Sequence, residues 1–305
     1  MSLWARDPSL AAEAEARRLN AQYLPGIQFP ASLHATGELS NALQDAELIV
    51  AALPSHGTRD ILRRAAAYVR PGTIVVSATK GLERDTLFRV SEIVNQELPN
   101  VRVAVLSGPS FAVEVARELP TAVCIASTDS SVVEVVQADF KSPYLRLYGT
   151  DDVLGVEIGG ALKNVIAIAA GVVEGLGLGH NALAGLITRG LAEMSRLACA
   201  AGAKRETLAG LSGLGDLVLT CNGALSRNRH VGIELAHGRA LQDVLGEMKM
   251  VAEGVRTTEA ALALATRYGV ELPIAAQVSE LLAGRKDPRT ALGELMVRPQ
   301  RAEVG

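Results

Sequence analysis

Short apolar runs rich in β-branched residues recur through the first half of the chain and alternate with segments of helical spacing. The runs cover residues 48–53, 73–78, 101–106, 121–126 and 145–148. They lack the alternation of polar and apolar residues that marks a half-exposed strand, which favours strands buried on both faces of a parallel sheet. Repeated strand–helix units of this kind predict an α/β fold class with a doubly wound parallel sheet and right-handed crossovers.

The second half of the chain has a different character. From about Val153 the β-branched runs disappear, and Gly, Ala and Leu dominate the sequence. The stretch 162–173 is apolar almost all round, as in a helix buried inside a bundle. With 305 residues, the chain is long enough for two domains of ~150 residues each. We therefore predict a sheet domain at residues 1–152 and an all-α domain at residues 153–305.

The composition argues against several classes of protein. The 30 basic and 33 acidic side chains give a net charge of -3, whereas nucleic-acid binders usually carry a basic surplus. Three scattered cysteines and five histidines show neither a disulfide framework nor metal-ligand spacing, which predicts a reducing, cytoplasmic environment and no metal. The longest apolar run, 165–173, is far shorter than the ~20 residues of a membrane span.

Three short loops follow predicted strands of the sheet. They are PSHG (54–57), ATKG (78–81) and SGPS (107–110). Ligands of open α/β sheets bind along the edge formed by the carboxyl ends of the strands. Small residues such as Gly108 let the backbone approach a ligand, and Ser110 would offer its hydroxyl and the N–H groups of a helix that it starts. Ordinary turn chemistry is the alternative for any one loop.

Two lysines occur at positions where a charge is informative. Lys80 lies between a buried strand and a Gly turn at the predicted ligand edge, where a cation suits a phosphate or a polarised carbonyl. Lys163 lies inside the apolar stretch, where a charge is costly unless it is paired or neutralised. Desolvation lowers a lysine pKa and makes the amine a usable acid or base near neutral pH. The alternatives are a solvated surface group for Lys80 and an interfacial lysine that reaches solvent for Lys163.

A third cluster joins a glycine loop to the start of a helix. Asp216 ends the loop SGLGD (212–216) and can hold a hydroxyl or the ammonium group of a lysine. Ser226 can cap a helix, while Arg227 and Asn228 offer a bidentate fork and an amide to a phosphate group. An ordinary glycine loop and helix cap are the alternative.

Arg6 follows the first predicted strand, at residues 2–5. In dinucleotide-binding folds an acidic residue at the end of the second strand holds the ribose 2′-hydroxyl, whereas an arginine accommodates a 2′-phosphate. If the strand at residues 2–5 corresponds to the second strand of such a fold, Arg6 favours NADP(H). The neighbouring Asp7 keeps NAD(H) open as the cofactor.

These segments together resemble the bacterial NAD(P)-dependent glycerol-3-phosphate dehydrogenase family. The matching segments are LWARDP (3–8), NAQYLPG (20–26), PSHG (54–57), ATKGLE (78–83), SGPSFAVEVA (107–116), EIGGALKNVIAIAAGV (157–172), ITRGLAEMSRL (187–197), LSGLGDLVLTC (211–221), LSRNR (225–229) and VAEGVRT (251–257). They run through almost the whole chain and are together far more specific than any one motif. The resemblance implies a Rossmann-like nucleotide domain followed by a helical substrate domain of the 6-phosphogluconate-dehydrogenase type.

The resemblance also implies an activity. It is reversible hydride transfer between dihydroxyacetone phosphate and sn-glycerol 3-phosphate for phospholipid synthesis, with NADP(H) or NAD(H) as cofactor, and we expect a homodimer. Lys163 is then the proton donor and acceptor, with Lys80 and Asp216 as further catalytic residues. The implied substrate-binding residues are Lys80, Gly108, Ser110, Lys163, Asp216, Ser226, Arg227 and Asn228. The implied cofactor contacts are Arg6, Tyr23, Lys80, Ala112, Arg227, Val251 and Glu253.

One element of the family pattern is not found near the N-terminus of the sequence. Family members begin with a strand, a G-x-G-x-x-G loop and a helix, and roughly 25 residues of this kind are missing before Trp4. That loop would hold the cofactor pyrophosphate at the N-terminus of its helix. We expect either a start codon further upstream or a genuine truncation, and the alternative to an active enzyme is an inactive truncated protein that binds nucleotide poorly. A β-hydroxyacid dehydrogenase of the same architecture is a further alternative.

Overall fold

The computed structural model describes residues 1–248, 251–300 and 302. Contacts between residues divide the chain into two units. The sheet unit comprises residues 1–79 and 90–153, and the helical unit comprises residues 80–89 and those from 154 onwards. The predicted division after residue 152 places residues 80–89 in the first domain. In the structure they belong to the helical unit, because Leu82 is buried in the core of the helices.

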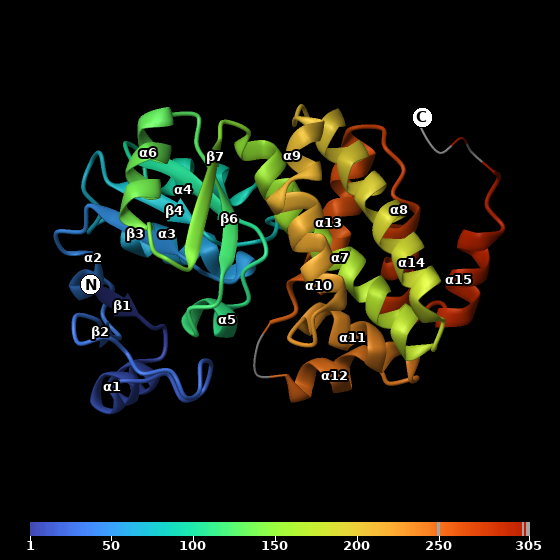
Figure 1. Ribbon diagram of the computed structural model, residues 1–305, viewed down its shortest axis with the longest axis horizontal. Helices are drawn as coiled ribbons and strands as arrows, with labels where there is room; N and C mark the ends of the chain where they lie inside the picture. The colour runs from blue at the N-terminus through green and yellow to red at the C-terminus, as the bar shows by residue number, and fades with distance from the viewer. Residues whose placement is uncertain (249–250, 301, 303–305) are drawn as a thin grey trace. The chain divides into compact units, whose positions relative to one another are not determined.

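The sheet unit contains a five-stranded sheet (Figure 1). In spatial order its strands are β3 (Leu48–Ala51), β4 (Ile74–Ser77), β5 (Arg102–Ser107), β6 (Thr121–Ala126) and β7 (Leu145–Thr150). Neighbouring strands are parallel except β5 and β6, which pair antiparallel. A further pair, β1 (Ser2–Trp4) and β2 (His34–Thr36), forms a separate parallel sheet. The doubly wound α/β class is confirmed, with one reversed strand pair.

The connection between β5 and β6 accounts for the reversal. It contains the short helix α5 (Ala112–Ala116), and Glu118 adopts a positive φ of 59° shortly after that helix. Parallel neighbours need a crossover that carries the chain back over the sheet, usually on a longer helix. With little more than one helical turn available, the chain instead runs back beside β5.

Helices cover the strands of the sheet unit. They are α1 (Pro8–Arg17), α2 (Leu39–Leu43), α3 (Thr58–Ala65), α4 (Val90–Glu97) and α6 (Ser130–Asp139), with a 3-10 turn η1 (Ser55–Gly57) before α3. Val75 and Val76 are adjacent on β4, and both are 0% exposed. Because adjacent strand residues point to opposite faces, both faces of β4 are buried, as the apolar run predicts.

The helical unit is built around one long helix. Its elements are α7 (Val153–Gly175), α8 (Gly179–Ala200), α9 (Arg205–Ala209), the π-helical turn η2 (Leu211–Gly215), α10 (Asp216–Asn222), α11 (Arg227–Ala236), α12 (Leu241–Glu247), α13 (Glu253–Arg267), α14 (Pro273–Leu282) and α15 (Pro288–Met296). By length and composition α7 could cross a membrane, but its most apolar window is 94% buried inside the protein. It is therefore the core helix of the unit, in agreement with the helix predicted around 162–173.

Glycines let α7 and α11 touch backbone to backbone. A Cβ atom on Gly171 of α7 would lie 1.9 Å from the carbonyl oxygen of Arg229 on α11. A Cβ atom on Gly232 of α11 would lie 1.9 Å from the carbonyl oxygen of Ile168. Because no larger side chain fits at either position, the sequence requires glycine at both. This contact fixes α11, whose N-terminal end carries residues 226–228 of the predicted site.

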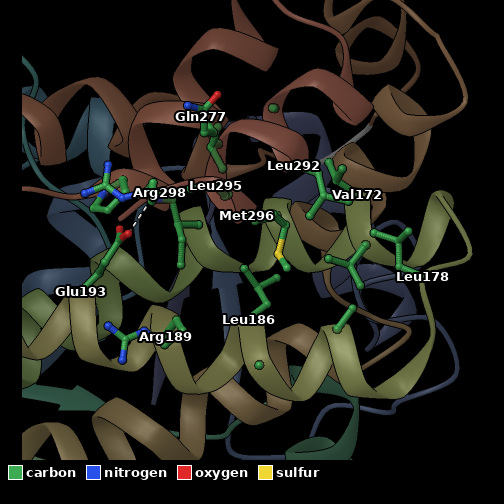
Figure 2. A pocket seen from close by; sticks show the side chains of 18 of the residues that line it. Val172, Leu178, Leu186, Arg189, Glu193, Gln277, Leu292, Leu295, Met296 and Arg298 are labelled. Atoms are coloured by element: carbon green, nitrogen blue, oxygen red, sulfur yellow. Dashed lines mark hydrogen bonds between the residues drawn. The ribbon is translucent and has the colours of Figure 1, made fainter. Parts of the chain in front are cut away.

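A cavity of about 740 Å³ lies among α7, α8, α14 and α15 (Figure 2). Its lining is mostly apolar and includes Leu186 and Met296, with Glu193 at one end (Figure 2). Glu193 is 4% exposed, and its carboxylate accepts hydrogen bonds from the backbone N–H groups of Ile274 and Ala275 at 2.5 and 3.3 Å. The carboxylate therefore caps the N-terminus of α14, where the helix dipole favours a negative charge.

Replacing Glu193 with Gln should change how stability depends on pH. Burial raises the pKa of Glu193 to about 7, although the two backbone N–H groups act in the opposite direction. A carboxyl group with a raised pKa in the folded state contributes its stabilisation fully at low pH and loses it as the pH rises through about 7. Relative to Glu193→Gln, the free energy of unfolding of the wild type should fall by roughly 3 kcal/mol from about pH 5 to about pH 8.

Urea unfolding of both proteins at the two pH values measures this difference. Glu206→Gln is the matched control, because Glu206 is exposed at the start of α9. It should keep the pH dependence of the wild type. Parallel stability curves for the wild type and Glu193→Gln would show that the buried carboxyl does not titrate in this range.

Candidate active site

A buried lysine and a buried aspartate form the centre of the site. Lys163 lies on α7 and is 6% exposed, and Asp216 is the first residue of α10 and is 1% exposed. Nζ of Lys163 donates to Oδ1 of Asp216 at 2.5 Å and to Oγ1 of Thr220 at 2.8 Å. The hydroxyl of Thr220 donates to the backbone carbonyl of Asp216 at 2.6 Å. Lys163 is therefore paired inside the helical unit and is not an interfacial lysine that reaches solvent.

Lys80 contacts the same carboxylate. Its Nζ lies 2.6 Å from Oδ2 of Asp216, and its side chain is 22% exposed. Lys80 and Asp216 are 136 residues apart in the chain, and Lys163 and Asp216 are 53 residues apart. The structure thus brings the three predicted catalytic residues together, with one ammonium group on each oxygen of one carboxylate.

Close backbone packing holds the loop that carries Asp216. A Cβ atom on Gly159 of α7 would lie 2.8 Å from the carbonyl oxygen of Ser212. A Cβ atom on Gly213 would lie 2.0 Å from the carbonyl oxygen of Leu208 on α9. These glycines let η2 lie directly against α7 and α9, and α10 begins where η2 ends. The glycines of this loop therefore serve packing, which brings the aspartate to the lysine.

The charges of the site set the protonation of Lys163. Burial, followed by the positive charge of Lys80, lowers the pKa of Lys163 to about 7, although Asp216 acts in the opposite direction. An amine with this pKa gains and loses a proton near neutral pH, as a general acid and base must. Cys221 is buried near the same lysine, and burial raises the pKa of its thiol to about 12. The thiol is therefore neutral near neutral pH and does not add a charge to the site.

Asn228 connects three helices of the helical unit. It is 7% exposed on α11, and its Nδ2 donates to Oδ1 of Asn164 on α7 at 2.9 Å. Its Oδ1 accepts a hydrogen bond from the backbone N–H of Gly254 on α13 at 2.9 Å. An amide group has two N–H hydrogens, so this arrangement is compatible with a further contact to a ligand. The sequence predicts the phosphate contact but gives no sign of this internal role.

Three of the predicted cofactor contacts lie together near the N-terminus of α11. Ser226 is the N-cap of α11, and its Oγ accepts a hydrogen bond from the backbone N–H of Arg229 at 3.2 Å, which confirms the predicted cap. Nη1 of Arg227 donates to the carbonyl oxygen of Val251 at 2.8 Å. Burial lowers the pKa of Arg227, and the negative charge of Glu253 opposes this effect. Arg227, Val251 and Glu253 therefore form one cluster.

The remaining predicted site residues belong to the sheet unit. Arg6 is exposed after β1, Tyr23 is 38% exposed, and Ala112 is exposed as the first residue of α5. The three loops predicted at one edge follow β3, β4 and β5, which are neighbouring parallel strands. Gly108, in the loop after β5, has a φ of 139° and a Cβ atom there would lie 3.1 Å from Cα of Val123.

Ser110 does not start a helix, contrary to the sequence prediction. The helix α5 begins two positions later, with Phe111 as its N-cap. The hydroxyl of Ser110 donates to the carbonyl oxygen of Gly108 at 3.0 Å. Serine hydroxyls often bond to nearby backbone groups in this way, which stabilises a turn in place of the first helical turn.

The carboxylate of Asp7 is engaged in capping. Its Oδ1 accepts hydrogen bonds from the backbone N–H and the hydroxyl of Ser9 at 2.9 and 2.7 Å. These bonds and one from the backbone N–H of Leu10 lower the pKa of Asp7. Of the two neighbouring candidates for a ribose contact, Asp7 therefore serves as the N-cap of α1, while Arg6 is exposed.

Two polar residues of the site were not among the predicted site residues. Thr220 lies four residues after Asp216 and therefore on the same face of α10. Asn164 follows Lys163 in the apolar core helix, where a buried amide requires a partner. The sequence contains a signal for each residue. For Thr220 it is the four-residue spacing from Asp216, and for Asn164 it is a polar residue within an apolar helix.

A doubly wound sheet unit joined to a helical unit with a buried lysine–aspartate pair defines a class of protein. Parallel α/β sheets of this kind bind dinucleotides at their carboxyl edge. A lysine that titrates near neutral pH can exchange a proton with a hydroxyl or carbonyl oxygen. The two features together are those of a nicotinamide-dependent dehydrogenase that acts on a CH–OH group.

Comparison with known proteins specifies the family. The N-terminal and C-terminal models of NAD-dependent glycerol-3-phosphate dehydrogenase match residues 1–133 and 152–293. The chain is 51% identical to the glycerol-3-phosphate dehydrogenase, NAD(P)+, of Geobacter metallireducens over an alignment of 308 residues. The alignment covers 100% of this chain and 92% of the relative. It matches the crystal structure of the glycerol-3-phosphate dehydrogenase of Coxiella burnetii with a TM-score of 0.94 and 39% identity, over 97% of this chain and 91% of that chain. The chain belongs to the NAD-dependent glycerol-3-phosphate dehydrogenase family.

Proposed function

We propose that this chain catalyses the reversible NAD(P)-dependent reduction of dihydroxyacetone phosphate to sn-glycerol 3-phosphate, which supplies phospholipid synthesis. The observation that carries the proposal is the pairing of Lys163 and Lys80 with the two oxygens of Asp216. The family to which the chain belongs supports the choice of substrate.

The lysines supply what a ketone reduction requires besides a hydride. As the hydride adds to carbon, negative charge develops on the carbonyl oxygen, and a proton must reach that atom. Protonated Lys163 donates this proton from Nζ and stabilises the developing charge, while Lys80 provides a second cation. Asp216 orients both Nζ atoms through its two oxygens. In the reverse direction neutral Lys163 accepts the proton of the alcohol.

Two features of the sheet unit support binding of a nicotinamide dinucleotide. Gly57 ends the turn after β3, and a Cβ atom there would meet no described atom within 4 Å, so there is room beside this part of the edge. Arg6 is exposed while Asp7 caps α1, which favours a cofactor with a 2′-phosphate, NADP(H). The cluster of Arg227, Val251 and Glu253 is proposed as a further contact to the cofactor. When bound, the nicotinamide supplies the hydride.

A direct assay tests the proposal. The purified chain should oxidise NADPH or NADH in the presence of dihydroxyacetone phosphate and form sn-glycerol 3-phosphate. Fluorescence titration with each cofactor should show which one binds more tightly. Turnover of a β-hydroxyacid in place of the phosphorylated ketone would assign a different dehydrogenase activity. Cofactor binding without turnover of either substrate would contradict the proposed function.

Replacing Arg227 with Ala should weaken binding of the phosphorylated ketone. A guanidinium forms strong charge-assisted hydrogen bonds with a phosphate, and losing one such contact costs about ten- to a hundredfold in binding. We therefore expect KM for dihydroxyacetone phosphate to rise by about that factor, with a smaller change in kcat. Steady-state kinetics with saturating cofactor measures both constants.

Unphosphorylated dihydroxyacetone separates the phosphate contact from other effects of this change. At saturating cofactor, the change from the wild type to Arg227→Ala should lower its kcat/KM much less than that of the phosphorylated ketone, because dihydroxyacetone lacks the phosphate. Arg256→Ala, at an exposed position of α13, is the matched control and should keep the wild-type KM. An unchanged KM of Arg227→Ala for the phosphorylated ketone would remove Arg227 from the substrate site.

A homodimer and a cytoplasmic location complete the proposal. The three cysteines are free, which suits a reducing compartment. Native mass spectrometry of the purified chain tests the dimer, and fractionation of the source cells tests the location.

A further inference from the structure

Residues 80–89 are joined at both ends to the sheet unit but belong by their contacts to the helical unit. Leu82 is 4% exposed within the core of the helices, and Leu87 packs against the same core. Lys80 is the first residue of this segment. The place of its ammonium group on Asp216 therefore depends on how the segment is attached to the helices.

The segment forms a closed loop. Leu82 and Arg89 pair in an antiparallel bridge, and the backbone N–H of Glu83 donates to the carbonyl oxygen of Phe88 at 2.9 Å. The hydroxyl of Thr86 donates to the carboxylate of Glu83 at 2.5 Å and accepts from the backbone N–H of Phe88 at 3.2 Å. These bonds hold the two ends of the loop together. The position of Arg89 at one end therefore restricts the position of the other end, which carries Lys80.

Arg89 connects this loop to α7. Its Nη1 lies 2.7 Å from Oε2 of Glu157, and the two side chains are 20% and 3% exposed. Glu157 lies on the same helix as Lys163. Breaking a buried ion pair leaves an uncompensated charge, so this pair resists separation. Arg84 of the loop also pairs with Glu259 of the helices at 2.7 Å, but those side chains are 71% and 59% exposed, and such pairs contribute little.

We propose that Arg89 and Glu157 are positioning residues of the reaction, which fix the loop 80–89 on α7 so that Lys80 stays on Asp216. The inference rests on the proposed function, because it assumes that the ammonium groups at Asp216 act in catalysis. A lysine has a long, flexible side chain, and here the like charge of Lys163 on the same carboxylate repels it. A fixed backbone is therefore needed to hold the second ammonium group in place.

Loss of the Arg89–Glu157 pair should change the pKa of Lys163, which a general loss of stability would not do. The positive charge of Lys80 lowers the pKa of Lys163, so moving Lys80 away should raise that pKa. Asp216 and Cys221 on α10 also face Lys163. The aspartate is retained in every variant below, and the buried thiol is neutral, so neither accounts for such a change.

The test compares Arg89→Met with the double variant Arg89→Met/Glu157→Gln. The double variant also removes the buried negative charge, so it keeps the test possible if the single variant does not fold. In both, kcat for ketone reduction should fall by about ten- to a hundredfold, as expected for misplacement of a group by about 1 Å. The pKa in the pH profile of kcat should rise, and KM should change less than kcat.

Two further variants make the test specific. Arg84→Met changes the same residue type in the same loop, but at the exposed pair, and should keep the wild-type kcat and pH profile. Arg89→Lys keeps a cation opposite Glu157 and should recover much of the kcat and the lower pKa. A loss of kcat in Arg84→Met equal to that in Arg89→Met would overturn the assignment.

A measurement without turnover separates this inference from the proposed function. NMR titration of isotope-labelled lysine reports the pKa of Lys163 directly in the full chain. A raised pKa in the double variant supports the positioning role, even if the wild type fails to reduce the phosphorylated ketone and the proposed function is lost. An unchanged pKa in the folded double variant shows that Arg89 and Glu157 do not position Lys80.

Discussion

Replacing Lys163 with Met is expected to lower kcat for ketone reduction by about a thousandfold or more, because the change removes the proposed proton donor. Methionine fills the space of the lysine side chain without a charge. Lys80 still pairs with Asp216 at 2.6 Å, so the buried carboxylate keeps a partner. Because the proton is needed in the transition state, KM should change much less than kcat. Steady-state kinetics of the folded variant, checked by circular dichroism, measures the effect.

The pH dependence of the wild type provides a second test of the same role. The protonated amine is the active form in reduction, so kcat for reduction should fall as the pH rises through about 7. Alcohol oxidation needs the neutral amine and should become faster over the same range. Lys141→Met, at an exposed lysine of the sheet unit, should leave both profiles unchanged. A kcat of Lys163→Met within about tenfold of the wild type would assign proton transfer to another group.

Replacing Asp216 with Asn should lower kcat for reduction by about a hundredfold at neutral pH. The change leaves Lys80 and Lys163 without the carboxylate that both contact. Asp216 raises the pKa of Lys163, so its loss should lower that pKa and leave less of the protonated acid at neutral pH. The pH profile of reduction should therefore move to lower pH, and part of the lost activity should return on acidification.

The direction in which the pH profile of Asp216→Asn moves decides whether Asp216 controls the protonation of Lys163. Asp243→Asn, at an exposed position of α12, is the matched control and should keep the wild-type profile. Thermal unfolding of both variants separates a loss of fold from a change in charge. A profile of Asp216→Asn that stays in place, or moves to higher pH, would mean that the carboxylate does not control the protonation of the lysine.

The residues of the proposed catalytic cluster could be chosen from the sequence, but their arrangement could not. A lysine inside an apolar helix is costly, so Lys163 implies a partner wherever it lies in the fold. Asp216 ends a glycine loop, which marks it as a polar residue at a helix start. That these two groups meet depends on backbone contacts of Gly159 and Gly213 with distant segments, and no local periodicity encodes such contacts.

The hydrogen bonds that polar side chains form within the protein also could not be predicted from the sequence. Asn228 and Ser110 both suit a ligand by chemical type, yet each bonds to the protein itself. The amide of Asn228 joins α7 and α13, and the hydroxyl of Ser110 closes a turn on Gly108. A hydrogen-bonding group takes whichever partner the folded backbone brings within reach, so residue type cannot distinguish a ligand contact from an internal one.

The sequence by itself determined the alternation of strands and helices, the change to an all-helical second half and the family. These follow from the spacing of apolar residues along the chain and from long ordered motifs, both of which are local properties. Only the tertiary structure decided that the loop 80–89 belongs to the helical unit and that Lys80 shares one carboxylate with Lys163. The physical reason is that these contacts join segments up to 136 residues apart, and their geometry is set by packing and paired charges in the folded chain.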